Sequence, residues 1–173
     1  MALRSRSSTA LAALMVPLFM AGCQPNPPAQ PMGPANELVG VWSLVAVDPG
    51  DGSPMIDPSQ TGLYIFADDH YSAVFTPGPE PRMKSAVTFQ PTQDELAEQY
   101  ASIIVNAGTY EVSGSSVTFH PMIAKSPGFV GGHQMSTFQV EGDTLVLTQD
   151  MIVGVDGVSP PNVSGSLTLV RLE

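Results

Sequence analysis

The stretch Leu38-Val39-Gly40-Val41-Trp42-Ser43-Leu44-Val45-Ala46-Val47 carries the only tryptophan of the chain and begins the part that can fold. Apart from Ser43 it is apolar on both faces, which predicts a strand that is covered on both sides. The last apolar run, residues 165–172, carries Arg171, the final basic residue of the sequence. We expect these two strands to be neighbours in a closed antiparallel barrel, with Trp42 and Arg171 stacked at one end.

Composition limits the fold and the partners. The 173 residues suggest one domain, and seventeen prolines with sixteen glycines argue against a largely helical one. The formal net charge of the whole chain is −10. Residues 37–173 contain four Lys and Arg against sixteen Asp and Glu, a formal charge of −12. Nucleic acids and anionic lipid headgroups need clustered cations, so neither is an expected partner of the folded part.

The N-terminal segment predicts export and lipid attachment. Arg4 and Arg6 precede an apolar run over residues 10–20, as in a signal peptide, so we assign residues 1–22 to that role. Met20-Ala21-Gly22-Cys23 follows and resembles the lipobox of bacterial lipoproteins, which implies acylation of Cys23. A single cysteine in an exported chain has no disulfide partner, which favours this interpretation over an ordinary secretory signal with an incidental cysteine.

Residues 23–36 are expected to form the acylated cysteine and its tether. Five prolines in residues 24–36 prevent a helix and favour an extended polyproline II segment. Gln24 after the cysteine resembles the pattern of outer-membrane sorting in double-membraned bacteria. We therefore expect a protein of the bacterial cell envelope, lipid-anchored in the outer membrane and facing the periplasm.

From Glu37 onward, short apolar runs alternate with turn residues, which indicates an all-β domain over residues 37–173. Thr92 and Glu95 form a capping box for one helix between the third and fourth strands. Its apolar positions, Leu96, Tyr100, Ile103 and Ile104, are expected to pack against the barrel across one mouth. The predicted strands number eight, which fits a closed barrel: 38–47, 62–66, 70–75, 108–113, 116–120, 135–140, 144–149 and 165–172.

The hairpin around Gly114-Ser115 has a predictable register. A two-residue loop pairs Val112 with Val117 and Tyr110 with Phe119, so these four side chains share one face. The other face then carries Thr109, Glu111, Thr118 and His120.

The opening strand resembles that of a known barrel class. Gly40-Val41-Trp42 matches the Gly-x-Trp of the first lipocalin strand, and lipocalin-type barrels often close with an arginine packed on that tryptophan. Further segments are similar to the bacterial lipocalin-like domain family of calycin-type barrels. Phe119 stands where that family often has a histidine, and Ser136 where an arginine is often found. The resemblance extends over residues 37–173 and is carried by 38–45, 64–73, 107–114, 117–120 and 129–131, together with Gln134.

The candidate ligand contacts are chiefly aromatic. Tyr71, Tyr110, Phe119 and Phe138 are predicted to line an apolar cavity, with His120 as a hydrogen-bonding group at its mouth. The alternative for the aromatic residues is a filled barrel core, and for His120 a surface position.

Catalytic and metal signals are weak. His70, His120 and His133 lie on separate segments without the close spacing of zinc ligands. The sequence has no nucleophile motif, although Glu111 and His120 would be diagonal neighbours able to act as an acid–base pair. We predict no catalytic residue, metal or cofactor.

The sequence thus predicts a membrane-anchored lipoprotein whose lipocalin-like barrel binds or sequesters a small hydrophobic molecule. Two alternatives stay open. One is a filled barrel that acts through a protein partner in the envelope. The other is an isomerase- or cyclase-type enzyme that acts on an apolar substrate through Glu111 and His120.

Overall fold

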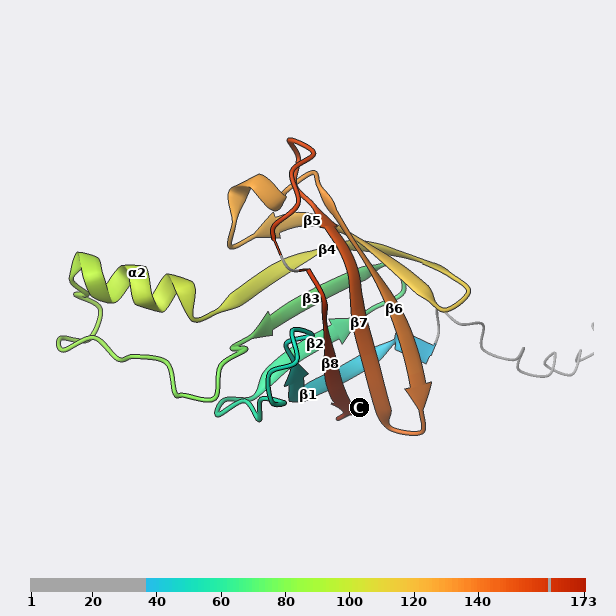
Figure 1. Ribbon diagram of the computed structural model, residues 1–173, viewed down its shortest axis with the longest axis horizontal. Helices are drawn as coiled ribbons and strands as arrows, with labels where there is room; N and C mark the ends of the chain where they lie inside the picture. The colour runs from blue at the N-terminus through green and yellow to red at the C-terminus, as the bar shows by residue number, and fades with distance from the viewer. Residues whose placement is uncertain (1–36, 162) are drawn as a thin grey trace, which may run out of the picture. The chain divides into compact units, whose positions relative to one another are not determined.

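The computed structural model describes residues 37–161 and 163–173, and these residues build an antiparallel barrel (Figure 1). The helix α2 (Gln93–Ala101) lies between the third and fourth strands in the chain, and a short 3₁₀ helix, η1 (Pro127–Phe129), follows the fifth. The strands in order are β1 (Gly40–Asp48), β2 (Gly62–Phe66), β3 (His70–Phe75), β4 (Ile104–Ser113), β5 (Ser116–Ala124), β6 (His133–Glu141), β7 (Thr144–Val153) and β8 (Gly165–Arg171).

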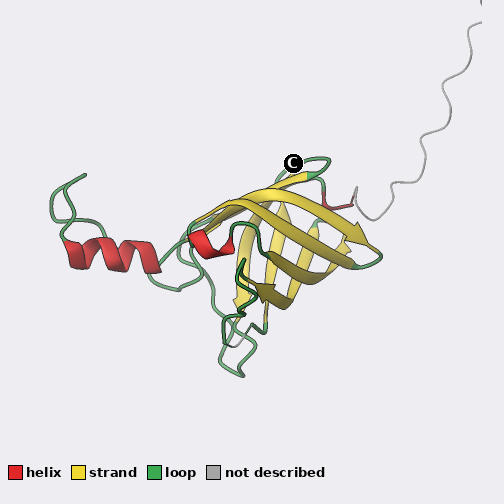
Figure 2. Ribbon diagram, turned by 90° about the horizontal axis from the view of Figure 1, so that it is seen from above, coloured by secondary structure: helices red, strands yellow, loops and turns green. Residues whose placement is uncertain are grey.

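Each strand pairs with its neighbours in the sequence, and β8 returns to pair with β1, which closes the barrel (Figure 2). Trp42 lies opposite Arg171 in that closing pair. The central hairpin has the predicted register, with Val112 opposite Val117 and Tyr110 opposite Phe119. The predicted fold, an eight-stranded antiparallel barrel with a helix between the third and fourth strands, is confirmed.

Strands β4 to β7 are longer than the sequence suggested, and β5 continues past Pro121. The proline is tolerated because the β4–β5 register shifts beside it, between Ala107 and Gly108, and a proline has no N–H for a regular ladder. Gly108 is required there, since a Cβ atom would meet the backbone carbonyl of His120. Most of this extra strand length, residues 104–107, 121–124, 133–134 and 150–153, lies at the end of the barrel that holds the cavity described below.

The barrel core is formed by the inward side chains of all eight strands, as period-2 alternation requires. Its aromatic part is tightly packed: the ring centroids of Tyr71 and Phe119 lie 4.7 Å apart, and those of Phe66 and Tyr110 lie 5.3 Å apart. All strands of the described barrel lie within residues 40–171, and each pairs with two neighbours in that range. The core cluster begins at Leu38.

Helix α2 has the predicted capping box, in which the Thr92 hydroxyl accepts from Glu95 N and the Glu95 carboxylate accepts from Thr92 N. The expectation that it packs its apolar face across the mouth was wrong. Leu96 and Tyr100 are 47% and 51% exposed, and no residue of the helix is buried. Ile104 belongs to β4 instead, so the predicted apolar stripe is divided between two elements.

Polar contacts attach α2 to the rest of the domain. The Tyr100 hydroxyl donates to Lys125 O at 3.1 Å, and Lys125 Nζ donates to Tyr100 O at 3.1 Å. Arg82 donates to Gln99 O at 2.8 Å. Within the described part of the chain, no helix has the length and apolar character needed to cross a membrane.

Candidate ligand cavity

One end of the barrel is sealed by Trp42 and Arg171. The guanidinium carbon of Arg171 lies 4.0 Å from the centroid of the Trp42 ring, and the indole is fully buried. Arg171 also donates to Val39 O at 2.7 Å and to Glu37 O at 2.8 Å. The indole Nε1–H donates to Leu38 O at 2.7 Å. The guanidinium therefore ties the segment before β1 to the end of β8, and the predicted stacking is present.

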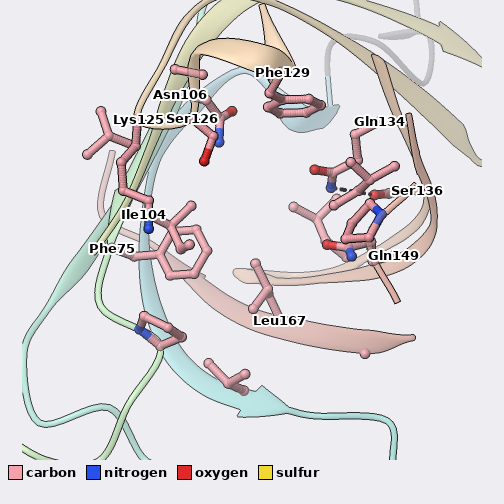
Figure 3. Close-up of a pocket in the computed structure, with 18 of the residues that line it drawn as sticks. Phe75, Ile104, Asn106, Lys125, Ser126, Phe129, Gln134, Ser136, Gln149 and Leu167 are labelled. Carbon is pink, nitrogen blue, oxygen red and sulfur yellow. Dashed lines mark hydrogen bonds between the residues drawn. The ribbon is translucent and has the colours of Figure 1, made fainter. Parts of the chain in front are cut away.

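The opposite end of the barrel contains a cavity of about 680 Å³ (Figure 3). Its walls come from the last residues of β1, β3, β5 and β7 and from the first residues of β4, β6 and β8. Because neighbouring strands run antiparallel, these termini meet at one end, and Trp42 and Arg171 lie at the other. The loop that follows β7 and the 3₁₀ helix η1 contribute further lining residues.

Most of the cavity wall is apolar. Phe75 and Ile104 lie together on one side, and Leu167 lies between them and the opposite wall (Figure 3). Such a surface releases water when an apolar ligand covers it. Further hydrophobic side chains of the lining come from β1, β2, β5, η1 and β7, among them Val47, Tyr64, Ala124, Phe129, Leu147 and Ile152.

The facing wall, on β6 and β7, carries three neutral polar side chains: Gln134, Ser136 and Gln149 (Figure 3). Ser136 and Gln149 are opposite each other in the β6–β7 register. Gln134 Nε2 donates to the Ser136 hydroxyl at 3.1 Å, and Gln149 Nε2 donates to Val163 O at 3.2 Å. Ser136 is only 1% exposed, so this polar group belongs to the interior. We call these three residues the polar wall.

The charged side chains of the lining are Asp48, Lys125 and Asp156, and each has a partner in its own surroundings. Asp48 accepts from Gly50 N at 2.9 Å, and Asp156 accepts from Val158 N at 3.0 Å. The ammonium of Lys125 donates to Tyr100 O and lies 4.8 Å from the centroid of that tyrosine ring. Each of these three side chains thus makes a hydrogen bond to a backbone group of a loop or of α2, and none of the three forms an ion pair with a described residue.

Two phenols lie inside the barrel. Tyr64 lines the cavity, and burial raises its pKa, with the phenol of Tyr71 as a smaller cause. Burial likewise raises the pKa of Tyr71. Both rings are therefore neutral in ordinary buffers. Among the described residues, the buried Tyr71 hydroxyl has no hydrogen-bond partner.

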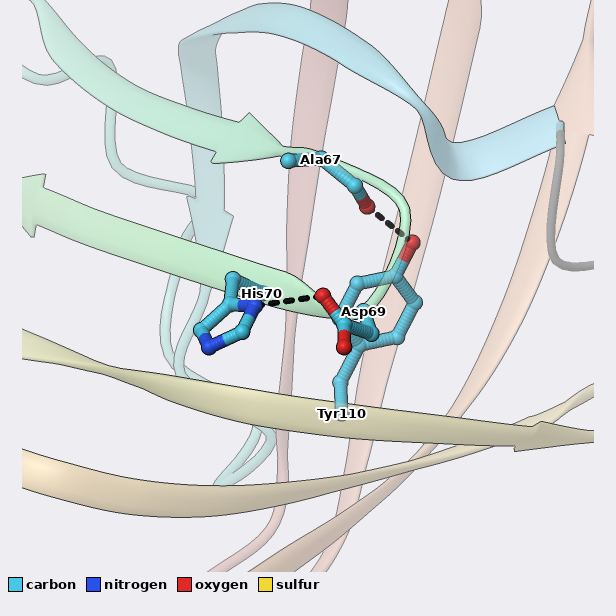
Figure 4. A network of polar contacts seen from close by, with 4 residues as sticks. All are labelled: Ala67, Asp69, His70 and Tyr110. Carbon is cyan, nitrogen blue, oxygen red and sulfur yellow. Dashed lines mark hydrogen bonds and ion pairs between the residues drawn. The ribbon is translucent and has the colours of Figure 1, made fainter.

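The predicted ligand contacts lie elsewhere. Tyr71, Tyr110, Phe119 and Phe138 are 3–5% exposed, belong to the packed core, and are not among the residues that line the cavity. The Tyr110 hydroxyl is already used, since it donates to Ala67 O at 2.7 Å (Figure 4). Strand alternation could have located the polar wall, because Gln134 and Ser136 are four and two residues before the inward-facing Phe138 on the same strand.

His120 is half-buried on the face of the central hairpin that turns away from Tyr110 and Phe119, so it does not reach the cavity. Glu111 is exposed on that same outer face. His70 contacts the carboxylate of its neighbour Asp69, and both side chains are exposed (Figure 4). In residues 37–161 and 163–173, no three His, Cys, Asp or Glu side chains are grouped to hold a metal ion.

Cys23 and the two segments assigned from sequence, 1–22 and 23–36, lie outside the described residues. The structure therefore concerns the barrel alone.

A closed antiparallel barrel of eight sequential strands, sealed at one end by a Trp–Arg stack and hollow at the other, defines a lipocalin-type fold. Residues 39–158 match the family model described as the lipocalin-like domain. The chain belongs to this family.

Solved structures with similar chains are remote in sequence. An uncharacterized protein from Bacteroides eggerthii is 11% identical with a TM-score of 0.42, and the match covers 78% of this chain and 98% of that one. A mutant of the fluorescent protein UnaG is 12% identical with a TM-score of 0.36, and the match covers 80% of this chain and 98% of that one. No curated protein sequence matches this chain.

Proposed function

We propose that this protein is a lipid-anchored binding protein of the cell envelope whose barrel holds a small, largely apolar molecule. The observation that carries the proposal is the cavity of about 680 Å³ at the unsealed end. Ligand sites in proteins usually measure about 300–1,000 Å³ and combine an apolar lining with a few polar groups, as this cavity does.

Binding would be driven by desolvation of the apolar wall. Each Å² of apolar surface removed from water contributes about 25 cal/mol, from which the cost of immobilising the ligand must be subtracted. The packed aromatic core beneath the cavity provides a rigid floor, so the site is formed before the ligand arrives. Binding of this kind would be sufficient for reversible sequestration or transport of the ligand.

The two residues that suggested the enzyme alternative do not line the cavity. Glu111 and His120 face outward on the central hairpin, and a substrate in the cavity would not touch them. An open cavity also weighs against the completely filled barrel, although a protein partner on the outer surface stays compatible with the fold.

Binding is tested by titrating the barrel domain, residues 37–173, with an environment-sensitive apolar dye. Ala124 lies opposite Asn106 in the register and lines the cavity, so Ala124→Trp should obstruct it and weaken dye binding at least tenfold. Thr118→Trp adds the same ring to the outer face of the same strand and should leave binding unchanged. Equal loss in both variants, or no saturable binding by the unaltered domain, would contradict the proposal.

Anchoring is tested independently by Cys23→Ser in the full chain expressed in a double-membraned bacterium. Loss of the acylated thiol should move the protein from the membrane fraction to the soluble periplasmic fraction and abolish its labelling by a radioactive fatty acid. The matched control is Gln30→Ser in the tether, which should remain at the membrane. Retention of the Cys23→Ser protein in the membrane fraction would refute lipid anchoring.

A further inference from the structure

We propose that the cavity selects an uncharged ligand whose apolar body ends in a neutral hydrogen-bonding group, a carboxamide or a hydroxyl, held by the polar wall of Gln134, Ser136 and Gln149. This inference rests on the proposed function and adds the chemical class of the ligand. It follows from the hydrogen-bonding groups of the polar wall, from the absence of charge among its three side chains, and from the apolar surface that faces it.

The polar wall offers both kinds of hydrogen-bonding partner. Each glutamine uses one amide N–H within the protein. Gln134 donates to the Ser136 hydroxyl, and Gln149 donates to Val163 O. Each carboxamide then presents its oxygen as an acceptor and a second N–H as a donor, and the Ser136 hydroxyl retains its own hydrogen. The internal bonds fix the orientation of the side chains, so little rotamer freedom remains to be lost when a ligand binds.

The polar wall offers a charged ligand group no counter-charge, because its three side chains, Gln134, Ser136 and Gln149, are neutral. Lys125 lies beside Ile104 on the side of the cavity opposite the polar wall (Figure 3), and its ammonium donates to Tyr100 O. Asp48, at the end of β1, and Asp156, in the loop after β7, each accept a hydrogen bond from a loop amide. Moving an unpaired carboxylate or ammonium from water against such a neutral wall is unfavourable, because the ion loses hydration without gaining a counter-ion. A carboxylate would also be repelled by the net charge of −12 on residues 37–173.

The rest of the cavity fits the body of such a ligand. Phe75 and Ile104 face the polar wall across the cavity (Figure 3). A molecule with its polar end against Gln134 and Gln149 would therefore place its apolar body against hydrophobic side chains. Asn106, the remaining amide of the lining, is also neutral and adds no charge.

The test uses probes that share one dodecyl chain and differ only at the end group: carboxamide, alcohol, carboxylate, amine or plain hydrocarbon. Their affinities for the barrel domain, which contains every described strand and core residue, are measured by displacement of the apolar dye at pH 7. We expect the amide and the alcohol to bind at least tenfold more tightly than the carboxylate and the amine, because a neutral end group gains a hydrogen bond while an unpaired charge loses its hydration.

Substitutions in the polar wall test whether it causes the preference for a neutral end group. Gln134→Met and Gln149→Met keep the side-chain volume and remove the amide, so together they should weaken the carboxamide probe about tenfold while the hydrocarbon binds as before. Gln139→Met makes the same change on the outer face of β6 and should have no effect. Circular dichroism confirms that each variant is folded.

The outcomes separate the two proposals. Tightest binding of the carboxylate or the amine, or equal binding of all end groups, would overturn the assignment of a neutral polar ligand and leave the binding function standing. A preference for the amide that survives both glutamine substitutions would overturn the role of the polar wall. Failure of every probe to bind would refute the proposed function itself.

Discussion

Replacement of Arg171 by alanine should open the sealed end of the barrel and lower its stability by about 3 kcal/mol. The stack on Trp42, at 4.0 Å, contributes about 1 kcal/mol. The part-buried hydrogen bond to Val39 O contributes about 1.5 kcal/mol as a charge-assisted bond, and the exposed one to Glu37 O about 0.5 kcal/mol. Loss of all three should lower the melting temperature of the barrel domain by about 10 °C.

The assay is urea unfolding of residues 37–173 followed by the fluorescence of Trp42, the only tryptophan. Lys84→Ala is the matched control, because it removes the same charge from an exposed side chain. Arg171→Leu should fall between the two, since it keeps an apolar cover on the indole and loses both hydrogen bonds. Equal unfolding midpoints for Arg171→Ala and Lys84→Ala would refute the role assigned to the stack and its hydrogen bonds.

Three further results are expected. Trp42→Phe should cost about 2–4 kcal/mol in urea unfolding followed by circular dichroism, because Leu38 O loses its buried donor and the smaller ring leaves a void; a cost below about 1 kcal/mol would contradict this. Gly108→Ala should cost at least about 2 kcal/mol by the same assay, since its Cβ would clash with the β5 backbone, and a neutral result would contradict the tight register. Hydrogen bonds from the Thr92 and Ala86 amides lower the pKa of Glu95, so its support of α2 is complete above pH 4.5 and is lost as the pH falls through the lowered pKa. NMR chemical shifts of α2 should therefore lose helical character in acid, and Thr92→Ala should already weaken the helix at pH 7.

The sequence was sufficient for the barrel because each strand is encoded locally. Alternating apolar residues predicted the strands, and the two-residue loop at Gly114 predicted the register of the central hairpin. The single tryptophan and the last basic residue indicated which strands close the barrel. The first two inferences use spacing along the chain, which the fold preserves, and the third uses the resemblance to lipocalin-type barrels.

The helix contact and the cavity needed information that local spacing lacks. The predicted apolar stripe runs over residues 96–104, but α2 ends at Ala101. Ile104 therefore belongs to β4 and not to the helix. For the cavity, alternation shows which residues face inward but not their depth along the barrel axis. Tyr110 and Phe119 do face inward, yet in the part of the barrel that aromatic rings fill.

The polar wall was overlooked for a related reason. Glutamine and serine on strands are commonly solvent-exposed, so their residue types alone do not place Gln134, Ser136 and Gln149 inside the barrel. Their inward position follows once Phe138 and Leu147 are known to be buried in the same strands. The structure adds that Ser136 is buried and that all three neutral side chains line the cavity, which makes them the candidate specificity residues.

The central claim is that the cavity holds a small organic molecule, and native mass spectrometry of the protein isolated gently from bacterial envelopes tests it most directly. We expect a bound species, uncharged and largely apolar, on the unaltered protein and on Thr118→Trp, and its absence from Ala124→Trp. A species that persists on Ala124→Trp would place the ligand outside the cavity. An empty unaltered protein that also fails to bind the apolar dye would contradict the claim.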